Sequence, residues 1–169
     1  NYANPDVLLE FVDILLYYFR RGARMIRLDA VAYLWKEIGT PCIHLPQTHQ
    51  IIKLFRDVLE LVEPGGLLMT ETNVPHVENI TYFGDGDEAH LVYQFSLPPL
   101  LLHAIYSGNT QYLRAWARSL EDLVIPENCT FFNFTASHDG VGLRPLEGLV
   151  PEEEVNRLLE AMRERGGYI

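Results

Sequence analysis

The chain has 169 residues, of which 48% are apolar, and a formal net charge of −10. This length and composition predict a globular domain with a hydrophobic core. The negative charge argues against binding to nucleic acids or anionic membranes, because both need a basic surface. The net charge does not exclude a small anionic substrate, because such a substrate needs only a local positive pocket.

The cysteines and the apolar stretches indicate a cytoplasmic protein that does not enter a membrane. Cys42 and Cys129 lie far apart in the sequence without the spacing of metal ligands, so we expect two reduced thiols. The most apolar stretch, 7–19, is too short to span a bilayer and contains two acids. We find no secretory signal peptide, and we expect neither a membrane nor a nucleic acid as partner.

A helix comes first, followed by a strand, a second helix and a second strand. The first helix is predicted at 5–20 with Asn4 as its N-cap, and it is apolar on most sides, so it should pack against a sheet. An apolar strand at 25–29, an amphipathic helix at 48–62 and a strand at 67–71 come next. The strand–helix–strand order predicts parallel strands.

Two charges interrupt the first strand. Arg27 and Asp29 are two residues apart, so in a strand both side chains lie on one face. We expect them to be buried, and buried charges are costly unless they are paired or functional. A structural ion pair and a functional site are therefore both open at this point.

The same alternation continues to the end of the chain. We predict a strand at 91–95, helical sequence at 98–106 and 110–120, a strand at 130–134 and a helix from Pro151. Such an α/β chain fits either an open doubly wound sheet or part of a (β/α)8 barrel. A complete barrel, which typically takes about 250 residues, does not fit. No glycine-rich phosphate loop follows a strand, which weighs against nucleotide binding.

Three acids stand at the C-terminal ends of predicted strands: Asp29, Glu71 and Asp139. In parallel α/β folds the carboxyl ends of the strands carry the active site. Two facing carboxylates allow glycoside chemistry, and a third can hold sugar hydroxyls. Acids are also common in turns for solubility, so this pattern alone leaves both interpretations open.

The residues around these acids resemble the motifs of the α-amylase superfamily, glycoside hydrolase family 13. The segment 27–33 (RLDAVAY) is similar to its nucleophile motif, Thr70-Glu71 to its acid/base motif, and Ser137-His138-Asp139 to its third conserved motif. Further segments resemble the sucrose phosphorylase branch of this family: 95–103, 138–142 and 147–151. The stretch 71–86 departs from sucrose phosphorylase and is more similar to phosphorylases of glucosylglycerate-type substrates.

The resemblance implies a retaining double displacement. Asp29 would attack C1 of an α-glucoside while Glu71 protonates the departing acceptor, and inorganic phosphate would then take the glucosyl group to give α-glucose 1-phosphate. A hydrolase or transglucosidase of the same superfamily would use water or a sugar in place of phosphate. A non-catalytic sugar-binding fragment is the third reading.

The resemblance also implies binding roles and an incomplete barrel. Arg27 would orient Asp29, His138 and Asp139 would bind ring hydroxyls, and Tyr33 would line the acceptor or phosphate side. No metal and no cofactor are implied; phosphate is a co-substrate. The four strands would be about the fourth to the seventh of eight, so residues 1–169 would be a segment of a catalytic (β/α)8 barrel whose open sheet edges favour self-association. Three aromatic residues are expected in the core: Trp35, Tyr93 and Trp116.

Overall fold

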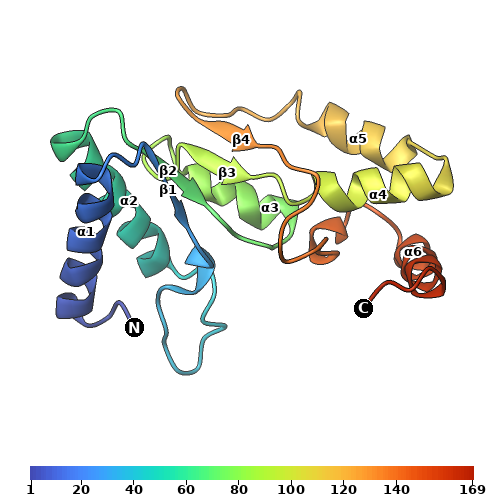
Figure 1. The fold of residues 1–169 in the computed structure, drawn as a ribbon, viewed down its shortest axis with the longest axis horizontal. Coiled ribbons are helices and arrows are strands. Elements are labelled where there is room, and N and C mark those ends of the chain that lie inside the picture. Colours follow the sequence, from blue (N-terminus) through green and yellow to red (C-terminus); the bar gives the residue numbers. More distant parts are fainter. The chain divides into compact units, whose positions relative to one another are not determined.

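The computed structural model describes all 169 residues and contains one sheet of four short parallel strands. The strands are β1 (Met25–Leu28), β2 (Leu67–Thr70), β3 (Leu91–Tyr93) and β4 (Thr130–Phe132), and they lie in this order across the sheet (Figure 1). All three pairings are parallel, which confirms the predicted α/β class. Each strand ends one or two residues earlier than predicted, so Asp29 and Glu71 stand just beyond the ladder.

The pairing register sorts the strand side chains onto two faces. Leu28 pairs with Thr70, and Thr70 pairs with Val92, so these three side chains point to the same face. Leu28 and Val92 pack there into the hydrophobic core. Arg27 and its partner Met69 belong to the alternate face, so Arg27 lies on the side of the sheet opposite to Leu28 and Val92, although Met69 beside it is itself buried.

Helices α1 (Pro5–Arg20) and α2 (Pro46–Val62) lie side by side against β1 and β2 (Figure 1). Asn4 caps α1 as predicted, because its side-chain oxygen accepts a hydrogen bond from the Asp6 backbone N–H at 2.9 Å. Helix α2 begins two residues earlier than predicted, at Pro46, since proline is favourable in a first helical turn. Only one side of α1 is packed, and the other leaves large apolar side chains exposed: Leu9, Phe11, Ile14, Tyr17 and Tyr18.

The chain divides into two compact units. The first comprises Asn1–Thr72, Glu78–Tyr93 and Ile125–Phe132, and contains the whole sheet with α1 and α2. The second comprises Asn73–Val77, Gln94–Val124 and Asn133–Ile169. Its longer helices are α4 (Leu97–Ser107), α5 (Gln111–Ser119) and α6 (Glu152–Glu164). The short helices of the chain are η1 (Val31–Tyr33), α3 (His76–Asn79), η2 (Ile80–Phe83) and η3 (Arg144–Leu146). None of the helices is long and apolar enough to cross a membrane.

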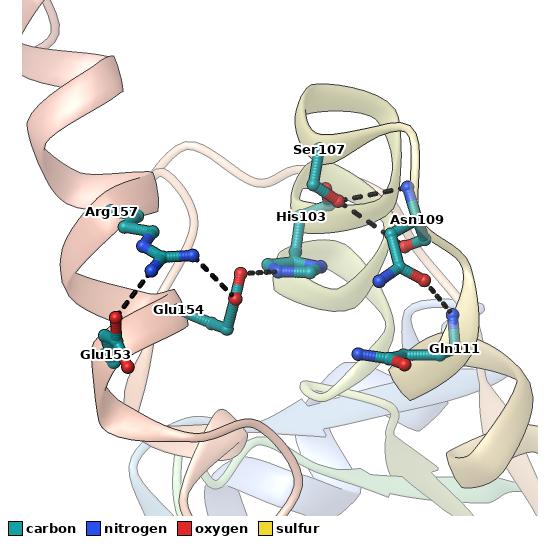
Figure 2. Close-up of polar contacts among 7 residues, drawn as sticks. All are labelled: His103, Ser107, Asn109, Gln111, Glu153, Glu154 and Arg157. Atoms are coloured by element: carbon teal, nitrogen blue, oxygen red, sulfur yellow. Dashed lines mark hydrogen bonds and ion pairs between the residues drawn. The ribbon is translucent and has the colours of Figure 1, made fainter.

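The second unit has its own core and a polar contact between two helices. Trp116 is buried in this core, as predicted, together with Leu100 and Leu146. Where α4 faces α6, Nε2 of the buried His103 lies 3.3 Å from a carboxylate oxygen of Glu154 (Figure 2). The arrangement couples the two helices through a charge-assisted hydrogen bond.

A histidine at the start of β3 makes the stability of the first unit depend on pH. Nδ1 of His90 accepts a hydrogen bond from the backbone N–H of Leu68 at 3.1 Å, so this nitrogen must be unprotonated. Burial lowers the pKa of His90 to about 4, and the charge of Arg56 acts in the same direction while that of Glu60 opposes it. An unfolded histidine titrates near pH 6.5.

We expect the folded state to lose stability as the pH falls from about 6.5 to about 4, because only the unfolded His90 binds a proton in this window. Below about pH 4 this effect levels off. His90 is partly exposed, so solvent screening reduces the loss to about 1–2 kcal/mol. Urea unfolding across this range should show a flatter profile for His90→Asn, which keeps an acceptor for the Leu68 amide. Equal losses in both proteins would contradict the prediction.

Candidate active site

The two catalytic candidates of the first unit stand on the same rim of the sheet. Asp29 directly follows β1 and Glu71 directly follows β2, and the last paired residues of these strands, Leu28 and Thr70, are partners in the ladder. Arg27 lies between the acids. Its Nη1 forms an ion pair with Oδ1 of Asp29, and its Nη2 is 4.0 Å from Oε1 of Glu71. The structure thus brings together three of the predicted site residues.

Arg27 is held in its charged form. Burial acts to lower its pKa, but the hydrogen bond to Asp29 and the negative charges of Asp29 and Glu71 act in the opposite direction, and the net shift of the pKa is upward. The guanidinium also lies over the ring of Tyr93, 5.4 Å from the ring centre. Tyr93, expected in the core, is therefore half-buried beside the site.

The two acids have different surroundings. The side chain of Asp29 is 71% exposed, whereas that of Glu71 is 14% exposed and that of Arg27 is 30% exposed. The prediction that both charges of the first strand are buried is wrong: Arg27 is partly exposed, and Asp29 is largely exposed because it lies beyond the end of an edge strand. An open carboxylate beside a sheltered one suits a division into nucleophile and general acid.

A contact that sequence reasoning missed links the two strand ends. The backbone of Ala30 adopts the left-handed conformation, with φ of 47° and ψ of 35°. Its N–H donates a hydrogen bond to Oε2 of Glu71 at 2.9 Å. The small residue directly after Asp29 was the only signal of this contact in the sequence.

Tyr33 lies in η1, the short helix that follows Asp29. Its ring is exposed, and Nζ of Lys36 lies 4.8 Å from the ring centre. Val31 and Ala32 are buried beneath it at 1% exposure each, which fixes the course of this segment. Tyr33 therefore presents an exposed aromatic ring with a cation beside it.

His138 and Asp139 belong to the second unit. Strand β4 ends at Phe132, so the two residues lie further from a strand end than predicted, in a turn closed by a bridge between Ser137 and Gly140. Nε2 of His138 is 3.2 Å from Oδ2 of Asp139, and both side chains are mostly exposed. The convergence of this pair on Asp29 and Glu71 stays a prediction.

No family model matches the chain. The chain is 57% identical over 169 residues to the glucosylglycerate phosphorylase of Spirochaeta thermophila, and 56% identical over 171 aligned residues to that of Escherichia coli. Both comparisons cover 100% of the chain but only 28% and 30% of these relatives. The sucrose 6F-phosphate phosphorylase of Thermoanaerobacter thermosaccharolyticum has a similar fold, with a TM-score of 0.76 at 22% identity over 92% of this chain and 30% of that one.

These likenesses and the arrangement of acids around a parallel sheet identify the class of protein. The chain belongs to glycoside hydrolase family 13, the α-amylase superfamily, and its fold corresponds to part of a (β/α)8 barrel, as predicted. Within that family it belongs to the branch that contains the glucosylglycerate and sucrose phosphorylases.

Proposed function

We propose that the protein containing this chain is a retaining α-glucoside phosphorylase that acts on a glucosylglycerate-type donor. The observation that carries the proposal is the placement of Arg27 between Asp29 and Glu71 on one rim of the sheet. The identity to glucosylglycerate phosphorylases over the whole chain supports the choice of donor. Since the chain spans less than a third of these relatives, the reaction is proposed for the whole protein.

The reaction proceeds in two displacements at C1 of the glucosyl group. A carboxylate oxygen of Asp29 bonds to C1 while the bond from C1 to the acceptor oxygen breaks, and Glu71 gives its proton to that oxygen. An oxygen of phosphate then bonds to C1 as the bond to Asp29 breaks, and Glu71 takes up the proton of the phosphate. Two inversions return the α configuration, so the product is α-glucose 1-phosphate.

Arg27 and the remaining candidates serve binding and orientation. Arg27 holds the carboxylate of Asp29 in place through their ion pair and balances negative charge between the two acids. Tyr33, with its exposed ring after the nucleophile, lines the acceptor or phosphate side. His138 and Asp139 bind ring hydroxyls, which strengthens as the ring distorts towards the transition state.

The proposal also includes the architecture of the protein and its location in the cell. Residues 1–169 form a segment of a catalytic barrel, about strands four to seven, and the unpaired edges of β1 and β4 favour pairing with further strands or self-association. The exposed apolar side of α1 supports burial against another element. A cytoplasmic location fits the two free cysteines, Cys42 and Cys129.

The proposed function predicts a phosphate-dependent product. The complete protein, incubated with glucosylglycerate and inorganic phosphate, should release α-glucose 1-phosphate, and omission of phosphate should remove this product because its phosphoryl group comes from the added phosphate. NMR of the fresh product determines the anomer. Free glucose formed at the same rate without phosphate would indicate a hydrolase, and a β-phosphate would exclude a retaining mechanism. Sucrose in place of glucosylglycerate tests the choice of donor.

A further inference from the structure

Ala30 has a backbone conformation that alanine rarely adopts. Four non-glycine residues of the chain have a positive φ, and Ala30 is the one next to a catalytic candidate. The left-handed conformation costs a residue with a Cβ atom about 1–2 kcal/mol. Such strain persists only where the surrounding structure enforces it, and it is concentrated at functional sites.

The residues that follow Ala30 fix its turn, whereas its own side chain does not take part. Val31 and Ala32, which follow it, are almost completely buried, and the Tyr33 N–H donates to the Ala30 carbonyl at 3.2 Å. The methyl group of Ala30 itself is exposed. Its side chain can therefore be replaced without loss of packing. Substitutions at Ala30 thus change mainly the preference of the backbone for the left-handed conformation.

The turn directs the Ala30 amide at one oxygen of Glu71. The N–H donates to Oε2 at 2.9 Å. The other oxygen, Oε1, accepts no hydrogen bond and lies 4.0 Å from Nη2 of Arg27. The two carboxylate oxygens are thus distinguished: the backbone anchors Oε2, whereas Oε1 has only the cation of Arg27 beside it.

We propose that Ala30 is a positioning residue for Glu71, and that its left-handed backbone anchors Oε2 so that Oε1 exchanges the proton with the reacting oxygens. This inference rests on the proposed function and specifies how its acid/base is held. The peptide bond from Asp29 to Ala30 carries both the nucleophile and the anchor. It therefore couples the position of Glu71 to that of Asp29, and a shift of about 1 Å in such a group can cost about 100-fold in rate.

The test compares substitutions that tolerate the left-handed conformation with one that does not. Ala30→Gly and Ala30→Asn keep the turn, because glycine and asparagine adopt it readily, whereas the β-branched Ala30→Val opposes it. Each variant is assayed in the complete protein with glucosylglycerate, whose leaving group needs a proton, and with α-glucosyl fluoride, whose leaving group does not. Glu71→Gln is the reference for loss of the acid.

We expect Ala30→Val to slow formation of the glucosyl-enzyme, measured as acceptor or fluoride release in a single turnover, by about 10–100-fold with glucosylglycerate and by less than about threefold with α-glucosyl fluoride. Ala30→Gly and Ala30→Asn should stay within about threefold of the parent on both substrates. Equal losses on both substrates in Ala30→Val, or losses in Ala30→Gly as large as those in Ala30→Val, would overturn the proposal. If Ala30→Val does not fold, Ala30→Thr replaces it in the same comparison.

The test of Ala30 gives a result that does not depend on whether the proposed phosphorylase function is correct. If the parent releases free glucose instead of α-glucose 1-phosphate, the phosphorylase assignment fails. Departure of the acceptor still needs a general acid in that case, so the difference between the two substrates continues to test the role of Ala30.

Discussion

Asp29→Asn is expected to lower glucosyl transfer by about 10⁴-fold or more, since an amide cannot form the ester bond to C1 on which the mechanism depends. The substitution keeps the size of the side chain. Asp29 is largely exposed, so the variant should fold like the parent. Rates of α-glucose 1-phosphate release measure the loss. Mass spectrometry should detect a covalent glucosyl adduct with a slowly hydrolysed fluorosugar in the parent and none in Asp29→Asn.

Asp57→Asn provides the matched control for this experiment. Asp57 is an exposed residue of α2 and forms no ion pair, so its replacement makes the same change in charge and shape away from the rim. We expect activity within about twofold of the parent for this control. Activity of Asp29→Asn within tenfold of the parent would contradict the assignment of the nucleophile.

Arg27→Met is expected to lower kcat by about 100–1,000-fold, because it removes the cation that lies between Asp29 and Glu71. The carboxylate of Asp29 would then lose the ion pair that orients it for attack on C1. Arg27→Lys should recover only part of this loss, since an ammonium group cannot direct two separate N–H groups at two acids as a guanidinium does. Separate measurement of kcat and KM should place the larger change in kcat.

Arg24→Met is the control, because Arg24 is an exposed arginine just before β1 that forms no ion pair. It removes one positive charge at the other end of the same strand and should leave kcat within about twofold of the parent. Full activity of Arg27→Lys would show that positive charge alone suffices, and full activity of Arg27→Met would remove Arg27 from the site.

Local sequence patterns predicted much of the fold. The alternation of apolar runs located four strands, and the pair Asn4-Pro5 located the start of α1, because caps and periodicity depend on neighbours in the chain. The strand ends were predicted too late by one or two residues, since the last ladder pair is decided by the neighbouring strand. The two acids at the rim followed from these strands.

The contacts within the site could not be predicted in the same way. The hydrogen bond from the Ala30 N–H to Glu71 joins residues that are 41 positions apart in the sequence. The residues around Ala30 do not specify a left-handed turn. The exposure of Asp29 likewise depends on which strands lie beside β1, and β1 is at an edge. Such properties arise from the tertiary arrangement.

The separation of the two sheet faces has a consequence for how this protein can change during evolution. The side chains of Leu28 and Val92 hold the helices in place, while Arg27 and the acids beyond the strands contribute little to that packing. Mutations on the reactive side can therefore accumulate without unfolding the scaffold. The residues around the two acids can therefore diverge between descendants of this protein while the sheet and its helices keep their packing.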